Sequence, residues 1–368
     1  MSILARARPE LLRFAGYSSA RMEAHGGRVF LNANESPWSG AGDATAQLQR
    51  YPEPQPPRLR AQLAACLDVA ADSVLVTRGS DEGIDLLTRA FCAAGRDAVV
   101  VAPPTFGMYA VAAAVQGVAV VEVALAPDTF AYPFDAVAAA CGEPVKLVYV
   151  CTPNNPTGTT SARADVLALA DTLRDRALVV ADEAYVEFAD GPSLCGDVRQ
   201  TPNLVVLRTL SKAHALAGAR VGALVAAADV VDLLRRIMAP YPLAAPCIAA
   251  AEAALAPTAL EATQLRVAAI RAERARVARA LAALRGVRAV LPSQANFLAV
   301  RLDDPASAYR ELLARGIVVR DLARYPGLGD ALRMTIGRPE ENDALLDVLT
   351  AWGRRTASVS GVSRGAAA

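Results

Sequence analysis

Lysine is the residue that this chain most nearly lacks. Among 38 basic residues only two are lysines, Lys146 and Lys212, and arginine supplies the rest. An arginine guanidinium stays protonated and cannot form a Schiff base with a carbonyl group, whereas a lysine amine can. Lys146 opens the apolar run at 145–150 and is interpreted as a strand-end residue. Lys212 follows an apolar run among small and hydroxyl residues, so a chemical role is predicted for it, with a structural role as the alternative.

The sequence also lacks the marks of several protein classes. Its six cysteines form no C-x-x-C pair and it has only two histidines, so no metal site is predicted and the cysteines are interpreted as reduced thiols. The net charge of +1 gives no electrostatic reason to expect nucleic acid or an anionic membrane as partner. No signal-peptide core and no uncharged apolar stretch of membrane-spanning length is found. We therefore expect a cytoplasmic protein that binds neither nucleic acid nor membrane.

Aromatic residues are scarce as well, at 5%, whereas hydrophobic residues make up 54%, so the core must be built from Ala, Val and Leu. Short apolar runs recur at 73–76, 98–102, 146–150, 178–181 and 204–207. Runs that are apolar on both faces are typical of buried parallel strands. Helical spacing lies between them, for example at Ile84, Leu87 and Phe91. This alternation predicts an α/β large domain with a mostly parallel sheet.

Beyond Pro240 the pattern changes to that of a smaller α+β domain. A long helix is predicted over about 260–284, strands at 295–300, 317–320 and 332–336, and a last helix over about 341–352. Between the first two strands, Asp304 and Pro305 are typical of a helix start. The predicted organisation is an N-terminal segment at 1–44 that packs on the small domain, a large domain at 45–238, a small domain at 239–353 and a disordered tail at 354–368.

Polar residues follow each apolar run of the large domain. Because ligands bind outside the carboxyl ends of parallel strands, these clusters are expected to meet at one sheet edge. The clusters occupy residues 77–82, 103–109, 151–158, 182–185 and 208–212. Together they supply the groups that pyridoxal phosphate needs: a lysine for a Schiff base, an acid for the ring nitrogen and an aromatic ring for the ring face. A helix N-terminus, hydroxyl groups and an arginine are also present for its phosphate.

Each cluster also has a structural interpretation. The Asn-Asn-Pro-Thr-Gly sequence at 154–158 is a good turn, and Asp182 and Asp81 both fit helix N-caps. Tyr185 and Tyr109 fit ordinary half-buried aromatic residues. The shared position of the clusters after successive strands is what favours a cofactor site.

The motifs resemble those of the pyridoxal-phosphate aminotransferases of the aspartate-aminotransferase-like superfamily and, within it, the histidinol-phosphate aminotransferases. The resemblance runs from about residue 13 to 352. It rests on the motifs at 31–35 (LNANE), 50–52 (RYP), 79–85 (GSDEGID), 104–109 (PTFGMY), 152–158 (TPNNPTG), 182–188 (DEAYVEF), 209–212 (TLSK), 216–220 (LAGAR) and 332–334 (LRM). It implies a large cofactor-binding domain of the superfamily fold with a smaller α+β domain.

The resemblance also implies roles for residues of the cofactor site. Lys212 would carry the cofactor and then act as the base that moves a proton from the substrate α-carbon to the cofactor's C4′ carbon. Asp182 would pair with the ring nitrogen, while Asn155 and Tyr185 would bond to the ring's phenolic oxygen. Tyr109 would stack on the ring face. The phosphate would be held by Ser80 and Asp81 through their backbone amides, by Ser211 and by Arg220.

Fewer residues are implied for the substrate. Arg333 and Arg320 would bind the anionic group of either substrate, the phosphate of histidinol phosphate or a carboxylate of glutamate. Tyr17 and Asn34 would line the same pocket. Tyr51 would reach the phosphate of the neighbouring subunit's cofactor, which implies a homodimer with shared active sites. The alternative for Arg320 is a surface strand residue.

Two positions depart from the family pattern. His214 stands where many members have phenylalanine and is interpreted as a packed neutral histidine, with cofactor tuning as the alternative. Phe106 stands where many members have tyrosine, so no hydrogen bond is assigned to it.

The activity implied is transamination of L-histidinol phosphate with 2-oxoglutarate to imidazole-acetol phosphate and glutamate in histidine biosynthesis. A threonine-phosphate decarboxylase and a broad aromatic or aliphatic aminotransferase are alternatives that use the same cofactor site. A pyridoxal-phosphate-binding regulator would need a DNA-binding module, for which there is no room before Arg50.

Overall fold

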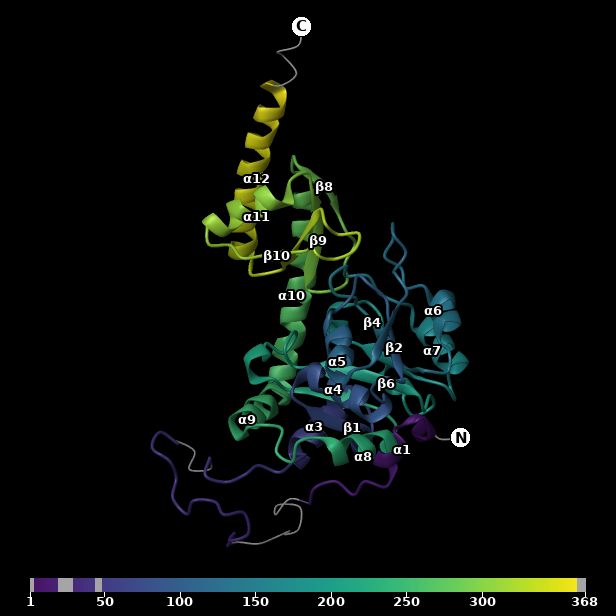
Figure 1. The fold of residues 1–368 in the computed structure, drawn as a ribbon. Helices are drawn as coiled ribbons and strands as arrows, with labels where there is room; N and C mark the ends of the chain where they lie inside the picture. Colours follow the sequence, from purple (N-terminus) through teal and green to yellow (C-terminus); the bar gives the residue numbers. More distant parts are fainter. Residues whose placement is uncertain (1–2, 19–28, 44–47, 363–368) are drawn as a thin grey trace.

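A seven-stranded sheet forms the centre of the large domain (Figure 1). The computed structural model describes residues 3–18, 29–43 and 48–362, with side chains described up to residue 355. The strand order is β1-β7-β6-β5-β4-β2-β3. The strands are β1 (Val74–Thr77), β2 (Ala98–Val101), β3 (Ala119–Glu122), β4 (Val145–Cys151), β5 (Leu178–Asp182), β6 (Leu204–Thr209) and β7 (Gly222–Val225). All neighbours from β3 to β6 are parallel, and β7 is antiparallel to both β1 and β6, so the predicted mostly parallel sheet is confirmed.

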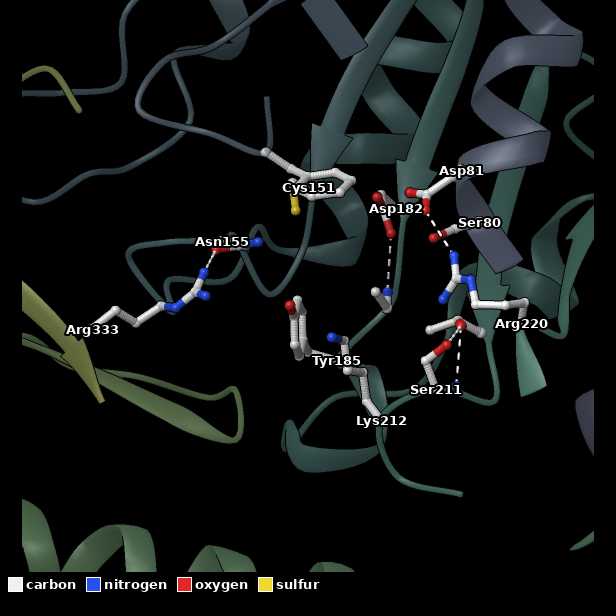
Figure 2. A pocket seen from close by; sticks show the side chains of 13 residues that line it. Ser80, Asp81, Cys151, Asn155, Asp182, Tyr185, Ser211, Lys212, Arg220 and Arg333 are labelled. Carbon is white, nitrogen blue, oxygen red and sulfur yellow. Dashed lines mark hydrogen bonds and ion pairs between the residues drawn. The ribbon is translucent and has the colours of Figure 1, made fainter. Parts of the chain in front are cut away.

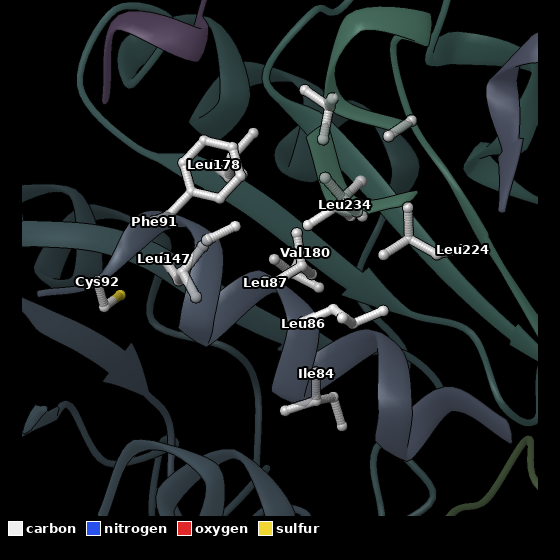
Figure 3. Close-up of a cluster of buried hydrophobic side chains, with 14 of the residues drawn as sticks. Ile84, Leu86, Leu87, Phe91, Cys92, Leu147, Leu178, Val180, Leu224 and Leu234 are labelled. Carbon is white, nitrogen blue, oxygen red and sulfur yellow. The ribbon is translucent and has the colours of Figure 1, made fainter. Parts of the chain in front are cut away.

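Helices cover both faces of this sheet. One face packs against α4 (Gly79–Phe91), α5 (Met108–Gln116) and α8 (Ala228–Ile237). Figure 3 shows Ile84, Leu87 and Phe91 of α4 among buried side chains of the sheet, the helical face that the sequence spacing predicted. The other face packs against α6 (Phe134–Ala140) and α7 (Arg163–Thr172), with α3 (Pro57–Leu67) and α9 (Ala245–Ala254) over its β1–β7 end. The described residues also contain the short 3-10 helices η1 (Ile3–Arg6), η2 (Ala71–Ser73), η3 (Val186–Phe188), η4 (Leu194–Asp197) and η5 (Ala217–Ala219).

The small domain is built on a four-stranded antiparallel sheet of order β10-β11-β9-β8. Its strands are β8 (Val287–Val290), β9 (Phe297–Leu302), β10 (Arg320–Asp321) and β11 (Ala331–Thr335), and α10 (Pro257–Ala282), α11 (Pro305–Ala314) and α12 (Pro339–Val362) accompany it. The long α10 runs from α9 beside the large domain to the small sheet (Figure 1). Asp304 caps α11 as predicted, because its side chain accepts a hydrogen bond from the Ser307 amide at 2.9 Å. Of the strand predicted at 317–320, only Arg320 lies in a strand, β10, so that prediction is wrong for 317–319.

The N-terminal residues pack on the large domain, not on the small one. Ile3 and Ala7 are buried with side chains of α4 and α8. The Arg8 amide donates to the carbonyl of Ala90, at the end of α4, over 2.9 Å. The sequence prediction is therefore wrong for residues 3–12, whose apolar side chains match the apolar surface of those helices. Residues 1–2, 19–28 and 44 of the predicted segment lie outside the described residues.

The small domain also begins later than predicted. Leu243, Ala251 and Leu255 are buried in one cluster with Leu59 of α3 and Val74 of β1. The segment from 243 to 255 therefore belongs to the large domain's packing, and the change to the small domain occurs along α10 and not at residue 239.

The last helix is longer than the sequence indicated. No proline follows Gly353, and α12 continues to Val362. A Cβ at Gly353 would collide with the carbonyl oxygen of Arg285, so glycine lets the helix pass close to the turn before β8. Arg355 then pairs with Glu311 on α11 at 2.7 Å. The predicted disordered tail is thus wrong for 354–362, and residues 363–368 lie outside the described part. In the described residues no helix has the length and apolarity that a membrane span requires.

Candidate active site

A cavity of about 220 Å³ opens at the carboxyl ends of β4, β5 and β6, beside the start of α4. Figure 2 shows side chains from both sheets converging on it. The cavity is lined by Ser80, Asp81, Phe106, Cys151, Asn155, Asp182, Ala184, Tyr185, Thr209, Ser211, Lys212, Arg220 and Arg333. This is the sheet edge where the polar clusters were expected to meet.

Asp182 is the acid of the cavity. It ends β5 and is 2% exposed. Its Oδ2 accepts a hydrogen bond from the Tyr109 hydroxyl at 2.7 Å, and its Oδ1 accepts one from the Ala184 amide at 3.1 Å. Burial raises the pKa of Asp182 to about 6, and these two hydrogen bonds oppose that rise. The carboxyl group is therefore fixed in position, and its two donors stabilise the ionised form.

Lys212 is the amine of the cavity. Its Nζ lies 5.6 Å from the centroid of the Tyr185 ring. Partial burial lowers the pKa of Lys212, and the positive charges of Arg333 and Arg220 lower it further. A lysine whose amine is less readily protonated is a better nucleophile and base near neutral pH.

The start of α4 gathers groups that could bind an anion. Ser80 and Asp81 are in the first turn of this helix, where backbone amides have no intrahelical partner. The guanidinium of Arg220 pairs with Asp81 at 2.9 Å, and Ser211 accepts a hydrogen bond from Thr209 at 2.9 Å. A helix N-terminus with a hydroxyl and an arginine beside it is a ready phosphate site.

Glycines make this arrangement possible. Gly79 has φ +73°, and a Cβ on it would lie 3.0 Å from Nη2 of Arg220. A Cβ on Gly222 would lie 2.8 Å from Cα of Gly79. The first residue of α4, the start of β7 and the Arg220 side chain therefore meet in a space that admits no further carbon atom.

Arg333 brings the small sheet into the site. It lies on β11 with its guanidinium carbon 5.2 Å from the Phe297 ring centroid, and it donates a hydrogen bond to Oδ1 of Asn155. Oδ1 of Asn155 accepts this bond, and the Nδ2 group is the donor that its side chain can offer to a ligand.

Residues 31–349 match the family model of the class I and II aminotransferases. The chain belongs to this family. It is 51% identical over 351 residues to a histidinol-phosphate aminotransferase of Xylella fastidiosa, an alignment that covers 95% of this chain and 96% of that one. It is 52% identical over 359 residues to one of Stenotrophomonas maltophilia, with 97% and 98% covered.

A solved structure with bound cofactor shares the fold. The histidinol-phosphate aminotransferase of Sinorhizobium meliloti in complex with pyridoxal-5′-phosphate matches with a TM-score of 0.74 and 29% identity, over 86% of this chain and 85% of that one. The predicted fold class is thereby confirmed.

Nine of the predicted site residues line the cavity of this aminotransferase: Ser80, Asp81, Asn155, Asp182, Tyr185, Ser211, Lys212, Arg220 and Arg333. The set supplies an amine, an acid, a helix start with a hydroxyl and an arginine beside it, and a second arginine within one cavity. Its donor chemistry fits pyridoxal phosphate, as the sequence predicted.

Tyr109 does not stack on a ligand, and that prediction is wrong. It is fully buried, lies behind Asp182, and stacks on Tyr149 with ring centroids 4.4 Å apart. Phe106 lines the cavity in its place. The two residues are three apart, and α5 begins between them at Met108, so one ring remains at the cavity and the other turns into the core.

The remaining predicted residues lie outside this cavity. Arg320 is exposed. It lies directly opposite Arg333 in the backbone register of β10 and β11, so the two side chains share one face of the small sheet. Tyr17 lines another cavity beside Arg236, and Asn34 is exposed. Tyr51 stacks on Tyr241 at 4.4 Å. In one chain, therefore, these four residues are not assembled with Lys212.

Sequence reasoning assigned no role to four lining residues: Phe106, Cys151, Ala184 and Thr209. All four belong to the polar clusters that follow the strands, so position was the available signal. His214 has a buried Nδ1 without a protein partner, and burial lowers its pKa, so this side chain is held neutral.

Proposed function

We propose that this aminotransferase converts L-histidinol phosphate and 2-oxoglutarate to imidazole-acetol phosphate and glutamate in histidine biosynthesis, with pyridoxal phosphate as cofactor. The observation that carries the proposal is the 51% identity over 95% of the chain to a histidinol-phosphate aminotransferase. A cavity in which Lys212, Asp182 and Arg333 converge supports it.

We assign the cofactor contacts as follows. Asp182 would pair with the ring nitrogen, Asn155 and Tyr185 with the phenolic oxygen, and Phe106 would cover the ring. The phosphate would lie on the amides of Ser80 and Asp81, with Ser211 and Arg220 beside it. Bound there, pyridoxal phosphate would supply an electron sink for the charge left when the substrate α-carbon loses its proton.

Lys212 would hold the cofactor and then move that proton. Its lowered pKa leaves more of the amine neutral near physiological pH than a lysine with its ordinary pKa would have. A neutral amine can accept the proton from the α-carbon and deliver it to the cofactor's C4′ carbon. Arginine could not serve here, because it stays protonated.

Arg333 would bind the anionic group of both substrates. Its planar guanidinium suits a phosphate and a carboxylate alike, so one site can take the two substrates in turn. Arg320 lies on the same face of the small sheet and would add a second positive charge. Tyr17 and Asn34 would complete the pocket.

We further propose a homodimer in which Tyr51 reaches the neighbouring subunit's cofactor phosphate. Tyr51 is 49% exposed, and the described residues before it present large apolar side chains, with Leu31 90% and Trp38 78% exposed. Such exposed apolar groups are typical of a surface that another chain covers. We place the enzyme in the cytoplasm, whose reducing conditions suit its six free cysteines.

Two measurements test the proposal. Purified protein with pyridoxal phosphate, histidinol phosphate and 2-oxoglutarate should form glutamate. Lys212→Ala should abolish both this activity and the visible absorbance of bound cofactor, and the matched control Lys146→Ala should retain both. Glutamate from phenylalanine but not from histidinol phosphate would point to an aromatic aminotransferase, and carbon dioxide from threonine phosphate to a decarboxylase. Either result would reject the proposed substrate.

A further inference from the structure

Tyr109 is held in one position beneath the cavity. It lies in the first turn of α5 and is 0% exposed. Its ring is nearly parallel to Tyr149, at 9°, and meets the edge of Phe106 at 84° with centroids 5.6 Å apart. In this packing the hydroxyl lies near the Cys151 thiol and donates to Oδ2 of Asp182 at 2.7 Å.

We propose that Tyr109 is a positioning residue for the cofactor, which it affects through Asp182: its hydroxyl keeps the carboxylate ionised and aimed at the ring nitrogen. The inference rests on the proposed function, because it assumes that pyridoxal phosphate occupies the cavity. A carboxyl group as buried as that of Asp182 is neutral unless donors stabilise its charge. A neutral carboxyl could not pair as an anion with a protonated ring nitrogen.

Tyr109 is suited to this task because it remains a donor. Burial and the nearby Asp182 raise the pKa of the Tyr109 hydroxyl well above its ordinary value, so the proton stays on the phenol oxygen. The Ala184 amide holds the other carboxylate oxygen. With one donor on each oxygen, the plane of the carboxyl group is fixed.

The other groups around Asp182 cannot replace this hydrogen bond. Titratable or charged groups that face Asp182 are Cys151 on β4, Asp81 on α4, Tyr149, Tyr185 and Lys212. Asp81 raises the pKa of Asp182, and Lys212 lowers it less than the Tyr109 hydrogen bond does. Loss of the Tyr109 hydroxyl therefore leaves burial less opposed, and the pKa of Asp182 moves above about 6.

The test is the affinity of the cofactor-free protein for pyridoxal phosphate between pH 6 and pH 9. Tyr109→Phe should bind about tenfold more weakly at pH 7, the effect of one lost hydrogen bond to a charged group, and recover toward wild type at pH 9, where Asp182 ionises again. The matched control is Tyr149→Phe, which loses a hydroxyl from the adjacent ring that bonds to Thr88 and not to Asp182. It should bind as wild type does at every pH.

The Asp182→Asn background decides whether Tyr109 acts through Asp182. There, adding Tyr109→Phe should weaken binding no further. An equal tenfold loss in that background, or equal affinities of Tyr109→Phe and Tyr149→Phe, would overturn the inference. Wild type that binds no pyridoxal phosphate would overturn the proposed function instead. If Tyr109→Phe fails to fold, infrared titration of the wild-type Asp182 carboxyl, against Asp182→Asn, serves: ionisation near pH 6 supports the inference, and ionisation only above pH 8 contradicts it.

Discussion

Arg333 donates a hydrogen bond to Oδ1 of Asn155 and thereby joins β11 of the small sheet to the segment that follows β4 of the large one. The residue that would bind the substrate anion thus contacts a residue that would bind the cofactor. A substrate anion that drew the guanidinium of Arg333 would change the hydrogen bonding of Asn155 at the same time. With the proposed roles, this one side-chain contact would link substrate recognition to cofactor recognition.

Replacement of Arg333 by lysine should impair both halves of the reaction. Lysine cannot form the planar two-point contact with a phosphate or carboxylate, so KM should rise about 100-fold, roughly 2.7 kcal/mol, for histidinol phosphate and for 2-oxoglutarate. Steady-state kinetics with each substrate varied in turn measures this. Arg320→Lys, exposed and outside the cavity, is the matched control with a smaller effect. A change in KM for only one substrate would contradict a shared anion site.

Arg333 should also influence the titration of Lys212. The guanidinium lowers the pKa of the Lys212 amine, after burial the largest cause. A lowered lysine pKa means that the neutral amine becomes abundant at a lower pH than in a lysine with its ordinary pKa. Arg333→Met removes a positive charge, so the pH at which Lys212 reacts with pyridoxal phosphate should move upward. Borohydride trapping of the adduct on cofactor-free protein across pH 7–10 measures the shift, and superimposed wild-type and variant profiles would contradict it.

Most of the large sheet could be predicted because its central strands are continuous apolar runs. β3 and β7 were missed. β3 is a partly exposed strand at the sheet edge, so it is not a buried apolar run. β7 has four residues beginning at Gly222 and no distinctive local pattern, and nothing local indicates that it pairs antiparallel with β1 and β6. The packing of residues 3–12 on α4 and α8 was missed because no local pattern indicates the partner of an apolar segment. A hydrophobic pattern predicts that a face is buried, and not which partner buries it.

The site was predictable where its residues follow successive strands, as Asp182 and Lys212 do. The contact between Arg333 and Asn155 joins positions 178 residues apart, and no local pattern encodes it. Which of the two rings faces the cavity, that of Phe106 or that of Tyr109, depends on where α5 begins. Helix boundaries are poorly determined by sequence. Of the four predicted residues outside the cavity of a single chain, only Tyr51 is assigned to the neighbouring subunit's site in the proposed dimer.

A methyl group on Gly222 should disrupt the phosphate site without touching the phosphate. Its Cβ would lie 2.7 Å from the carbonyl oxygen of Arg208 and 2.8 Å from Cα of Gly79, and backbone atoms cannot yield as side chains do. We expect Gly222→Ala to lower affinity for pyridoxal phosphate at least tenfold and to cost about 1–3 kcal/mol of stability. Gly191→Ala, where a Cβ meets no atom within 4 Å, is the matched control. Equal cofactor affinities for the two variants would contradict the prediction.

Arg208 neutralises two carboxylates beneath the site. Its Nη2 lies 2.6 Å from Glu187 and its Nη1 3.6 Å from Glu183, whose side chain is 2% exposed. Arg208→Met leaves both carboxylates without their cation, so the variant should lose about 3–5 kcal/mol of unfolding free energy at pH 7. Chemical denaturation measures the loss. Arg208→Lys, which keeps the charge, should recover part of it.

The pH dependence of the stability lost in Arg208→Met shows whether unpaired charge or lost packing causes it. Burial raises the folded-state pKa of Glu183, and Arg208 opposes the rise, so in Arg208→Met the pKa moves higher still. A carboxyl whose pKa is raised by folding is most favourable to stability below its unfolded pKa, and the benefit is lost as pH climbs through the folded pKa. The difference between wild type and Arg208→Met should therefore narrow as pH falls from 7 to 5. A difference that stayed constant with pH would mean that lost packing, and not unpaired charge, destabilises the variant.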